Sequence, residues 1–296
     1  MTDLFIGVVS HVGSRFAQNQ GENGLAASLG RALAPLGVSS QVEINLRDAW
    51  DPSILNLDLE EAHSSQRASL KFEKNWLDYL SEGSSASQRT RMAKRIEFKA
   101  RGWFMLAGFR RVSGHEPSLK ALRRLINIEL SHRHLWRSAI ESGAQWALII
   151  EDDGGCSDIE DLALGIQHLI QQIPNSDPSQ SRPQYVNISS SFSADELGVR
   201  GLLRESNHIW KGSRKRIIQE SSRPITNTVC AILYRREFLE AIVEEFAQMP
   251  FSPVIPIDFK LNQALINLFK SGKLTDGACW QVEPSPIVQM SMHQMG

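Results

Sequence analysis

The chain has 296 residues, of which 42% are hydrophobic and 22% are charged, and its formal net charge is -1. This composition can fill a substantial core, and the nearly balanced charge gives the whole chain no preference for nucleic acid or anionic membranes. Three distant cysteines without zinc-site spacing, no signal-peptide pattern and no apolar run of about 18 residues lead us to expect a soluble cytoplasmic protein.

The N-terminal segment predicts one unit of a parallel α/β sheet. Residues 4–10, LFIGVVS, form a short apolar and β-branched run that is typical of a buried strand. A polar loop follows, then leucines at helical spacing over residues 24–37, and then an alternating strand over residues 39–46. This order favours two parallel strands with a right-handed crossover, so the first loop would lie at the ligand-binding edge of the sheet.

Residues 50–118 are predicted to form a helical insertion within a single domain that spans residues 1–296. The segment begins acidic and becomes basic, with eight Lys or Arg residues between Arg89 and Arg111 and an apolar stripe at near-helical spacing. This basic helix could bind peripherally to the inner face of an anionic membrane. It could equally be a solvated helix face that pairs with the acidic residues 51–61.

The second half of the chain predicts the elements that complete the domain. Ser118 can cap a long helix that Gly143 ends, and the buried strand QWALII follows. Residues 194–223 are polar and basic and predict a loop. Helices are predicted over 159–173, 236–249 and 256–269, and strands over 185–193 and 225–234. The expected fold is therefore α/β, with a mostly parallel Rossmann-like sheet flanked by helices.

The stretch LIIEDDGG, at residues 148–155, places Glu151, Asp152 and Asp153 directly after an apolar strand. Adjacent carboxylates repel unless a positive charge neutralises them, and Mg²⁺ and Mn²⁺ prefer oxygen ligands. The two glycines would let a ligand approach the backbone closely. The alternative is a helix N-terminus, where acids favour the helix dipole. That alternative explains the acids at 158–161 better than it explains three consecutive acids after a strand.

Several segments carry a family resemblance. They are IELSHRHLWRSAIESGAQWALIIEDDGG, ITNTVCAILYRREFLEAI, PIDFKLN and WQVEPSPIVQMS, in this order. Together they resemble the family 25 glycosyltransferases, the lipooligosaccharide and collagen galactosyltransferase group, over about residues 126–156 and 225–291. The opening VVSHVGSRF and the 50–118 insertion depart from that family's pattern, so the resemblance implies the broader GT-A superfamily.

The resemblance implies a metal-dependent glycosyltransferase with a GT-A-like fold. It would move a sugar from a nucleotide-sugar donor, most commonly a UDP-sugar, to a hydroxyl of a glycan or lipid-linked acceptor. In that picture Glu151 and Asp153 bind Mn²⁺ or Mg²⁺, which neutralises the departing diphosphate, and Glu151 or Asp152 binds the ribose or a metal-bound water. Asp258 is the candidate base for the acceptor hydroxyl, and it could also cap the helix that follows.

Further candidate residues follow the first two strands and lie near the end of the chain. Ser10, His11 and Arg15 could bind the donor nucleotide, or they could form an ordinary polar turn. Asp48 follows the second strand and could accept hydrogen bonds from uracil or ribose. His293 could be a late metal ligand.

Two other features have a functional and a structural interpretation. Ser131 and His132 match the resembling block but lie within a predicted helix, where a histidine is more often packed or solvated than catalytic. A basic cluster in the predicted loop could close over the donor phosphates or simply lie on the surface. This cluster comprises Lys211, Arg214, Lys215 and Arg216.

Two other functions compete with the transferase hypothesis. A metal-dependent nucleotidyltransferase or phosphohydrolase also uses carboxylates at strand ends, but it would need a second acidic set for a second metal. A non-enzymatic protein could bind nucleic acid or a membrane surface through the basic patches, with salt-sensitive binding that ignores nucleotide sugars. The binding hypothesis leaves residues 151–155 unexplained, whereas the transferase hypothesis expects no nucleic-acid partner.

Overall fold

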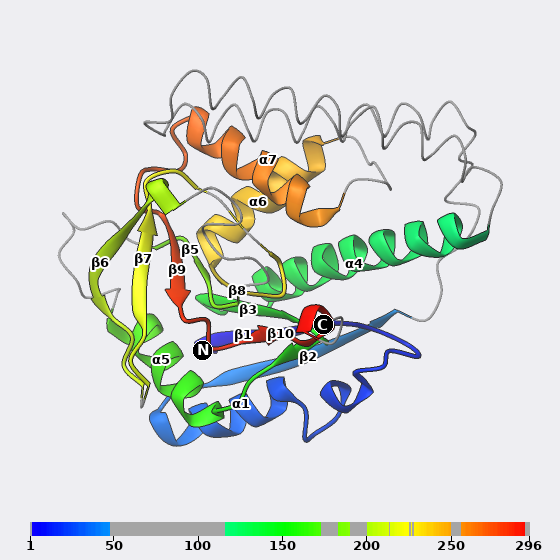
Figure 1. Ribbon diagram of the computed structural model, residues 1–296, viewed down its shortest axis with the longest axis horizontal. Coiled ribbons are helices and arrows are strands. Elements are labelled where there is room, and N and C mark those ends of the chain that lie inside the picture. The colour runs from blue at the N-terminus through cyan, green and yellow to red at the C-terminus, as the bar shows by residue number, and fades with distance from the viewer. Residues whose placement is uncertain are drawn as a thin grey trace.

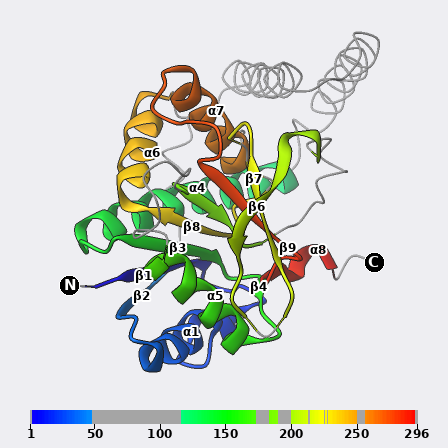
Figure 2. The same ribbon diagram turned by 90° about the vertical axis from the view of Figure 1, so that its left-hand side faces the viewer.

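The computed structural model describes residues 2–47, 116–172, 183–189, 200–212, 214–224, 226, 228–249 and 256–293 (Figure 1). Helices cover both faces of a central sheet in these ranges, as the two perpendicular views show (Figures 1 and 2). None of the helices described there combines the length and the apolar character that crossing a membrane requires. Asp48 and nearly all of the predicted 50–118 insertion, including its basic helix, lie outside the described residues.

The central sheet has eight strands and is mixed. In spatial order the strands are β2 (Ser40–Arg47), β1 (Leu4–His11), β3 (Trp146–Glu151), β8 (Ala231–Arg235), β5 (Tyr185–Asn187), β9 (Cys279–Glu283), β7 (Ile217–Ser221) and β6 (Leu203–Ile209). Strands β8 and β7 run opposite to all the others. The predicted α/β class is therefore confirmed. Strands β2, β1 and β3 form a parallel block of three, and β5 and β9 form a second parallel pair.

The helices divide into two layers. Helices α1 (Leu25–Leu33) and α5 (Ile159–Gln172) cover one face, and α4 (Glu116–Glu141), α6 (Arg236–Gln248) and α7 (Ile257–Lys270) cover the other (Figure 2). Short 3-10 helices lie in the connections: η1 (Ala17–Gln20), η2 (Ala34–Leu36) and η5 (Arg200–Leu202). The alternating side chains of β1 enter both cores, with Ile6 on the α1 side and Phe5 on the α4 side. This explains why β1 is apolar along nearly its whole length.

A second, two-stranded sheet brings the end of the chain to β3. Strand β4 (Gly154–Gly155) pairs antiparallel with β10 (Val288–Gln289), and α8 (Met290–His293) follows. A Cβ atom on Gly154 would lie 2.9 Å from Ile150 Cγ2, and one on Gly155 would lie 2.9 Å from Met290 Cγ. A side chain at Gly154 would therefore press on β3, and one at Gly155 would press on the C-terminal segment, while the predicted approach of a ligand to these glycines stays a prediction.

The predicted loop over residues 194–223 is wrong where the structure describes it. Residues 203–221 contain the hairpin β6–β7, which forms the outer edge of the sheet. Its strands are polar because many of their side chains are partly or fully exposed at this edge. Arg204 pairs with Glu220 across the hairpin at 3.2 Å. A polar alternating pattern at a sheet edge looks like a loop when only hydrophobic runs are counted.

Two predicted helix caps are also wrong. Helix α4 begins at Glu116, so Ser118 lies within the first turn and does not precede the helix. Helix α7 has Pro256 at its N-cap position, and Asp258 lies in the first turn. The predicted end of α4 is confirmed, because Gly143 follows the helix in the left-handed conformation (φ 74°) that favours glycine.

Candidate metal and donor site

The carboxyl ends of β1 and β3 meet at one edge of the sheet. Val9 of β1 pairs with Glu151 of β3, so Ser10 and His11 reach the same edge as the acidic residues. Open α/β sheets commonly bind ligands at this edge. The structure therefore brings together residues that lie about 140 positions apart in the sequence.

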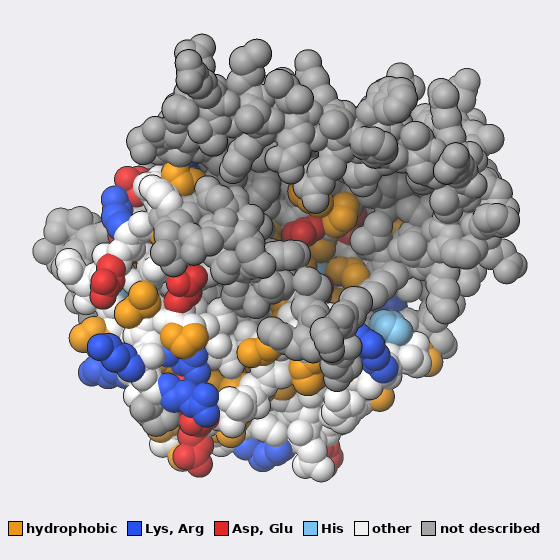
Figure 3. Space-filling model, viewed as in Figure 1, with side chains coloured by type: hydrophobic (Ala, Val, Ile, Leu, Met, Phe, Trp, Pro, Cys, Tyr) orange, Lys and Arg blue, Asp and Glu red, His pale blue; other side chains and the backbone are white. Residues whose placement is uncertain are grey.

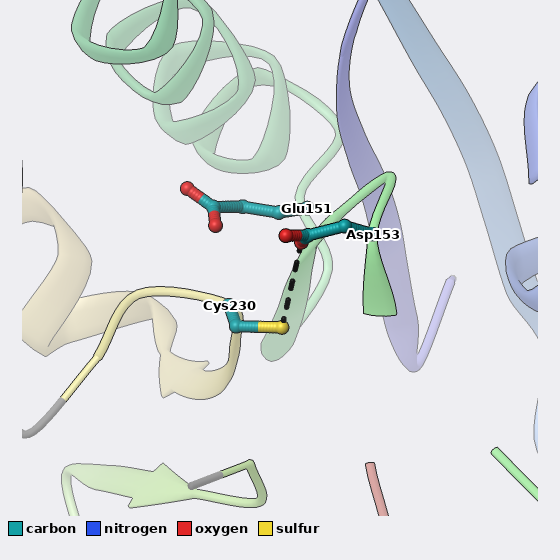
Figure 4. Close-up of side chains that lie close together, drawn as sticks. All are labelled: Glu151, Asp153 and Cys230. Atoms are coloured by element: carbon teal, nitrogen blue, oxygen red, sulfur yellow. Dashed lines mark hydrogen bonds between the residues drawn. The ribbon is translucent and has the colours of Figure 1, made fainter. Parts of the chain in front are cut away.

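Three side chains at this edge could hold a metal ion (Figure 4). Glu151 ends β3, Asp153 follows in the turn towards β4, and Cys230 precedes β8. One potential ligand atom from each side chain lies within 4.8 Å of the others. The sulfur of Cys230 is 3.9 Å from Asp153 Oδ1, as the dashed line shows. The backbone N–H of Glu151 donates to the carbonyl of Cys230 at 2.7 Å, which fixes the two segments together.

Asp153 is buried and held by the C-terminal segment. Its Oδ2 accepts hydrogen bonds from the amide of Gln289 at 3.2 Å and from the hydroxyl of Ser291. The backbone N–H of Met290 donates to the Asp153 carbonyl at 2.8 Å. Burial and the negative charge of Glu151 raise the pKa of Asp153, although the two hydrogen bonds oppose this. A cation between the carboxylates would favour their ionised forms.

The chemistry of these side chains fits a hard divalent cation. Glu151 and Asp153 offer oxygen atoms, which Mg²⁺ and Mn²⁺ prefer. Burial, followed by the charges of Glu151 and Asp153, raises the pKa of the Cys230 thiol well above its usual range. Cys230 is therefore a neutral thiol at neutral pH, and the two carboxylates are the ligands that fit.

Asp152 takes part in a separate network that shapes the turn. Its Oδ2 accepts a hydrogen bond from the Ser10 hydroxyl at 2.5 Å, and Gln20 donates to the same hydroxyl at 2.7 Å. The amide of Asn19 donates to the carbonyls of Asp152, at 2.6 Å, and of Gly154, at 3.1 Å. Ser10 is buried, and its hydroxyl bonds to Asp152 and Gln20. A donor-binding role for Asp152 remains a prediction.

The other candidates for donor binding differ in what surrounds them. His11 is exposed, with Nδ1 2.9 Å from the carbonyl oxygen of Val12. Arg15 is exposed, and its guanidinium lies 4.9 Å from the centre of the Phe16 ring. Both follow β1 at the correct edge. The backbone of His293 ends α8 next to the site, but its side chain lies outside the described residues.

Asp258 is partly buried in the first turn of α7. Burial raises the pKa of this carboxyl to about 6, and the charge of Glu151 adds to the rise. A hydrogen bond from the Phe259 N–H to Oδ1, at 3.0 Å, opposes it. The charge of Glu151 thus contributes to the raised pKa of both Asp153 and Asp258. In the space-filling view of Figure 3, acidic and hydrophobic side chains are visible near the centre of the molecule.

Helix α4 contacts Glu151 and α7 through buried side chains. Ser131 and His132 are fully buried, so the match to the resembling block corresponds to packed residues. His132 Nε2 lies 3.5 Å from Glu151 Oε1. One turn earlier, Glu129 bonds to the buried ammonium of Lys260 on α7. Arg133 adds a second cation, with Nη2 2.7 Å from Glu129 Oε1.

The basic cluster does not act as one group. Arg216 is buried, with Nε 3.0 Å from Asp161 Oδ2 and a hydrogen bond from Nη1 to the Pro284 carbonyl. The backbone N–H of Arg214 donates to Asp161 Oδ1 at 2.8 Å. These contacts fasten the β6–β7 hairpin to α5, and the phosphate-binding role of the cluster stays a prediction. Lys211 and Lys215 are exposed.

Sequence reasoning missed five residues of the site. Gln289 and Ser291 were singled out only as part of WQVEPSPIVQMS, without a role. The others had no local signal, because their contacts form only when distant segments meet: Asn19, Gln20 and Cys230.

Comparisons with known proteins do not extend this description. No protein-family model matches the chain, and no curated protein is similar to it in sequence. The resemblance to glycosyltransferases therefore stays a prediction from the sequence, and the function has to be argued from the site.

Proposed function

We propose that the protein is a metal-dependent glycosyltransferase with a nucleotide-sugar donor, most commonly a UDP-sugar, and a glycan or lipid-linked acceptor. The observation that supports this best is the convergence of Glu151, Asp153 and Asp258. Glu151 and Asp153 lie together at the carboxyl edge of the parallel strands, and the charge of Glu151 also contributes to the raised pKa of Asp258 in the first turn of α7. This arrangement offers a cation site next to a carboxyl group with a raised pKa.

Each carboxylate has a separate role in the proposed reaction. Glu151 and Asp153 would hold the cation, which when bound supplies charge neutralisation for the departing diphosphate. Asp258 would accept the proton of the acceptor hydroxyl through Oδ2, because Oδ1 already accepts from Phe259. Its pKa of about 6 leaves it ionised at neutral pH and makes it a stronger base than an ordinary carboxylate.

The loop after β1 completes the proposed donor site. His11 and Arg15 are exposed at this edge, where Arg15 could pair with a donor phosphate. Asp152 would contact the nucleoside, and the hydrogen bonds from Ser10 and Asn19 hold it and its backbone in place. Such support reduces the ordering cost of ligand binding.

The competing enzymatic function is less well supported. A two-metal nucleotidyltransferase or phosphohydrolase needs a second set of ligands. Among the described residues, one group of three potential ligands is present, and only two of them are carboxylates. This favours a single cation and therefore the transferase. The non-enzymatic hypothesis gives no reason for two carboxylates to share this partly buried edge.

Calorimetry with a panel of nucleotide sugars tests the proposal. We expect one donor to bind with Mn²⁺, to lose binding when a chelator is added, and to lose it in Asp153→Asn. The matched control is Asp276→Asn, because Asp276 is exposed and pairs with Arg204 at the far edge of the sheet. Absence of binding by the wild type under every condition would contradict the donor site.

A further inference from the structure

His132 is a buried polar group without an evident structural purpose. Its side chain is fully buried in the middle of α4, and its ring lies 5.8 Å from that of Trp136. Neither ring nitrogen has a hydrogen-bond partner among the residues that the structure describes. Buried polar groups are nearly always paired, because losing water without gaining a partner is costly. A phenylalanine would fill the same space without that cost.

The imidazole faces one of the two candidate metal ligands. His132 Nε2 is 3.5 Å from Glu151 Oε1, slightly longer than the N–H···O distance of about 2.7–3.2 Å in a hydrogen bond. Glu151 thus has the imidazole on one side, while one of its oxygens lies within 4.8 Å of a carboxylate oxygen of Asp153. Hydrogen bonds in catalytic sites are often long before ligands bind and shorten afterwards.

We propose that His132 is a positioning residue that donates from Nε2 to Glu151 and holds this carboxylate in its metal-binding orientation. The inference rests on the proposed metal site. Carboxylates that bind metals are usually hydrogen-bonded by a second group, and losing that group typically lowers metal affinity about 10–100-fold. The role requires a proton on Nε2.

The position of His132 on α4 suits this role. Glu129, one turn earlier on α4, bonds to Lys260 of α7, and both side chains are buried. The same helix therefore contacts Glu151 through His132 and ties down the first turn of α7, which carries Asp258. A side chain on such an anchored helix can hold its partner more accurately than one on a loop.

Three substitutions separate this role from simple packing. His132→Phe keeps an aromatic ring beside Trp136 but has no donor. In His132→Gln the amide nitrogen falls close to the position of Nε2, whereas in His132→Asn it falls close to Nδ1. The matched control is His134→Gln, because His134 lies on the same helix but pairs with Glu43 at 2.9 Å and is exposed.

Mn²⁺ affinity, measured by calorimetry without any donor, is the first readout. We expect His132→Phe and His132→Asn to bind Mn²⁺ about 10–100-fold more weakly than the wild type, and His132→Gln to recover most of the affinity. His134→Gln should bind as the wild type does. Equal affinity in all variants, with tight binding by the wild type, would overturn the role of His132 and leave the metal site intact. Absence of Mn²⁺ binding by the wild type would overturn both.

The second readout needs no metal. In ¹⁵N NMR of histidine-labelled protein, we expect the Nε2-protonated tautomer for His132 and a change in its Nε2 signal in Glu151→Gln. A ring without a proton on Nε2, or a signal that Glu151→Gln leaves unchanged, would overturn the proposed contact even if metal binds.

Discussion

Asp258 should make the folded protein less stable at neutral pH, because its pKa is raised. The carboxyl group titrates at about 6 in the folded chain, against an ordinary value of 3.8. Below about pH 3 both states carry the proton, so the group has no cost. As the pH rises to about 6, the unfolded chain releases its proton before the folded chain does, and the free energy of unfolding falls.

The size of this effect follows from the two pKa values. The difference between 3.8 and about 6 corresponds to about 3 kcal/mol, at about 1.4 kcal/mol for each tenfold change in proton affinity. The side chain is not fully buried, so water reduces the cost. Asp258→Asn never ionises, and its amide oxygen can still accept from the Phe259 N–H. We therefore expect the variant to be more stable than the wild type by about 1–3 kcal/mol at pH values of about 7 and above.

Urea denaturation of both proteins between about pH 3 and 8 measures this difference. The advantage of Asp258→Asn should be near zero at the lowest pH, increase between about pH 4 and 6, and then stay constant. The same variant should lose about 10²–10⁴-fold in transfer rate, because the proposed base is missing. Asp276→Asn, at an exposed carboxylate, is the control. A pH-independent difference, or a variant less stable than the wild type at neutral pH, would refute the reasoning.

The remaining predictions concern the groups around the site. Lys260→Met should lower the free energy of unfolding by about 3 kcal/mol in urea denaturation, because it leaves Glu129 buried with one cation fewer. A loss below about 1 kcal/mol would contradict this. Arg216→Met should lower the free energy of unfolding by about 3–5 kcal/mol, because it leaves the charge of Asp161 buried without the Arg216 cation. Nucleotide-sugar affinity in calorimetry should not change. Weaker donor binding by the variant would support a role of Arg216 in binding the donor phosphates. Gly154→Ala should cost about 1–3 kcal/mol and weaken Mn²⁺ binding, because the new Cβ would press on the backbone oxygen of Glu151 at 3.1 Å. Unchanged melting and Mn²⁺ affinity would show that the turn can adjust.

The parts of the fold that the sequence predicts well have strong local signals. Strands β1 and β3 are apolar on both faces, because helices cover both sides of the sheet there. Helices α1, α5, α6 and α7 carry their apolar residues at helical spacing, and the structure places them within a few residues of their predicted bounds. Strands β6 and β7 lack such a signal, because an edge hairpin with few core-facing side chains can be mostly polar.

Some residues of the candidate site also have a local sequence signal, and others do not. The acidic run after β3 was visible because like charges in sequence are unusual after an apolar strand. Asp258 was predicted from its segment, but its raised pKa depends on burial, which no local pattern reveals. Cys230 and His132 join the site only through the pairing of β8 with β3 and the packing of α4. Contacts of this kind arise from the tertiary fold, so one sequence does not predict them.

Electron paramagnetic resonance of Mn²⁺ tests the central claim most directly, because free and bound Mn²⁺ give different signals. The account predicts one bound Mn²⁺ per chain in the wild type, and a loss of at least about 10-fold in affinity in Asp153→Asn and in Glu151→Gln, with Asp276→Asn unaffected. Binding that is absent from the wild type, or equal in all four proteins, would contradict a cation site formed by Glu151 and Asp153.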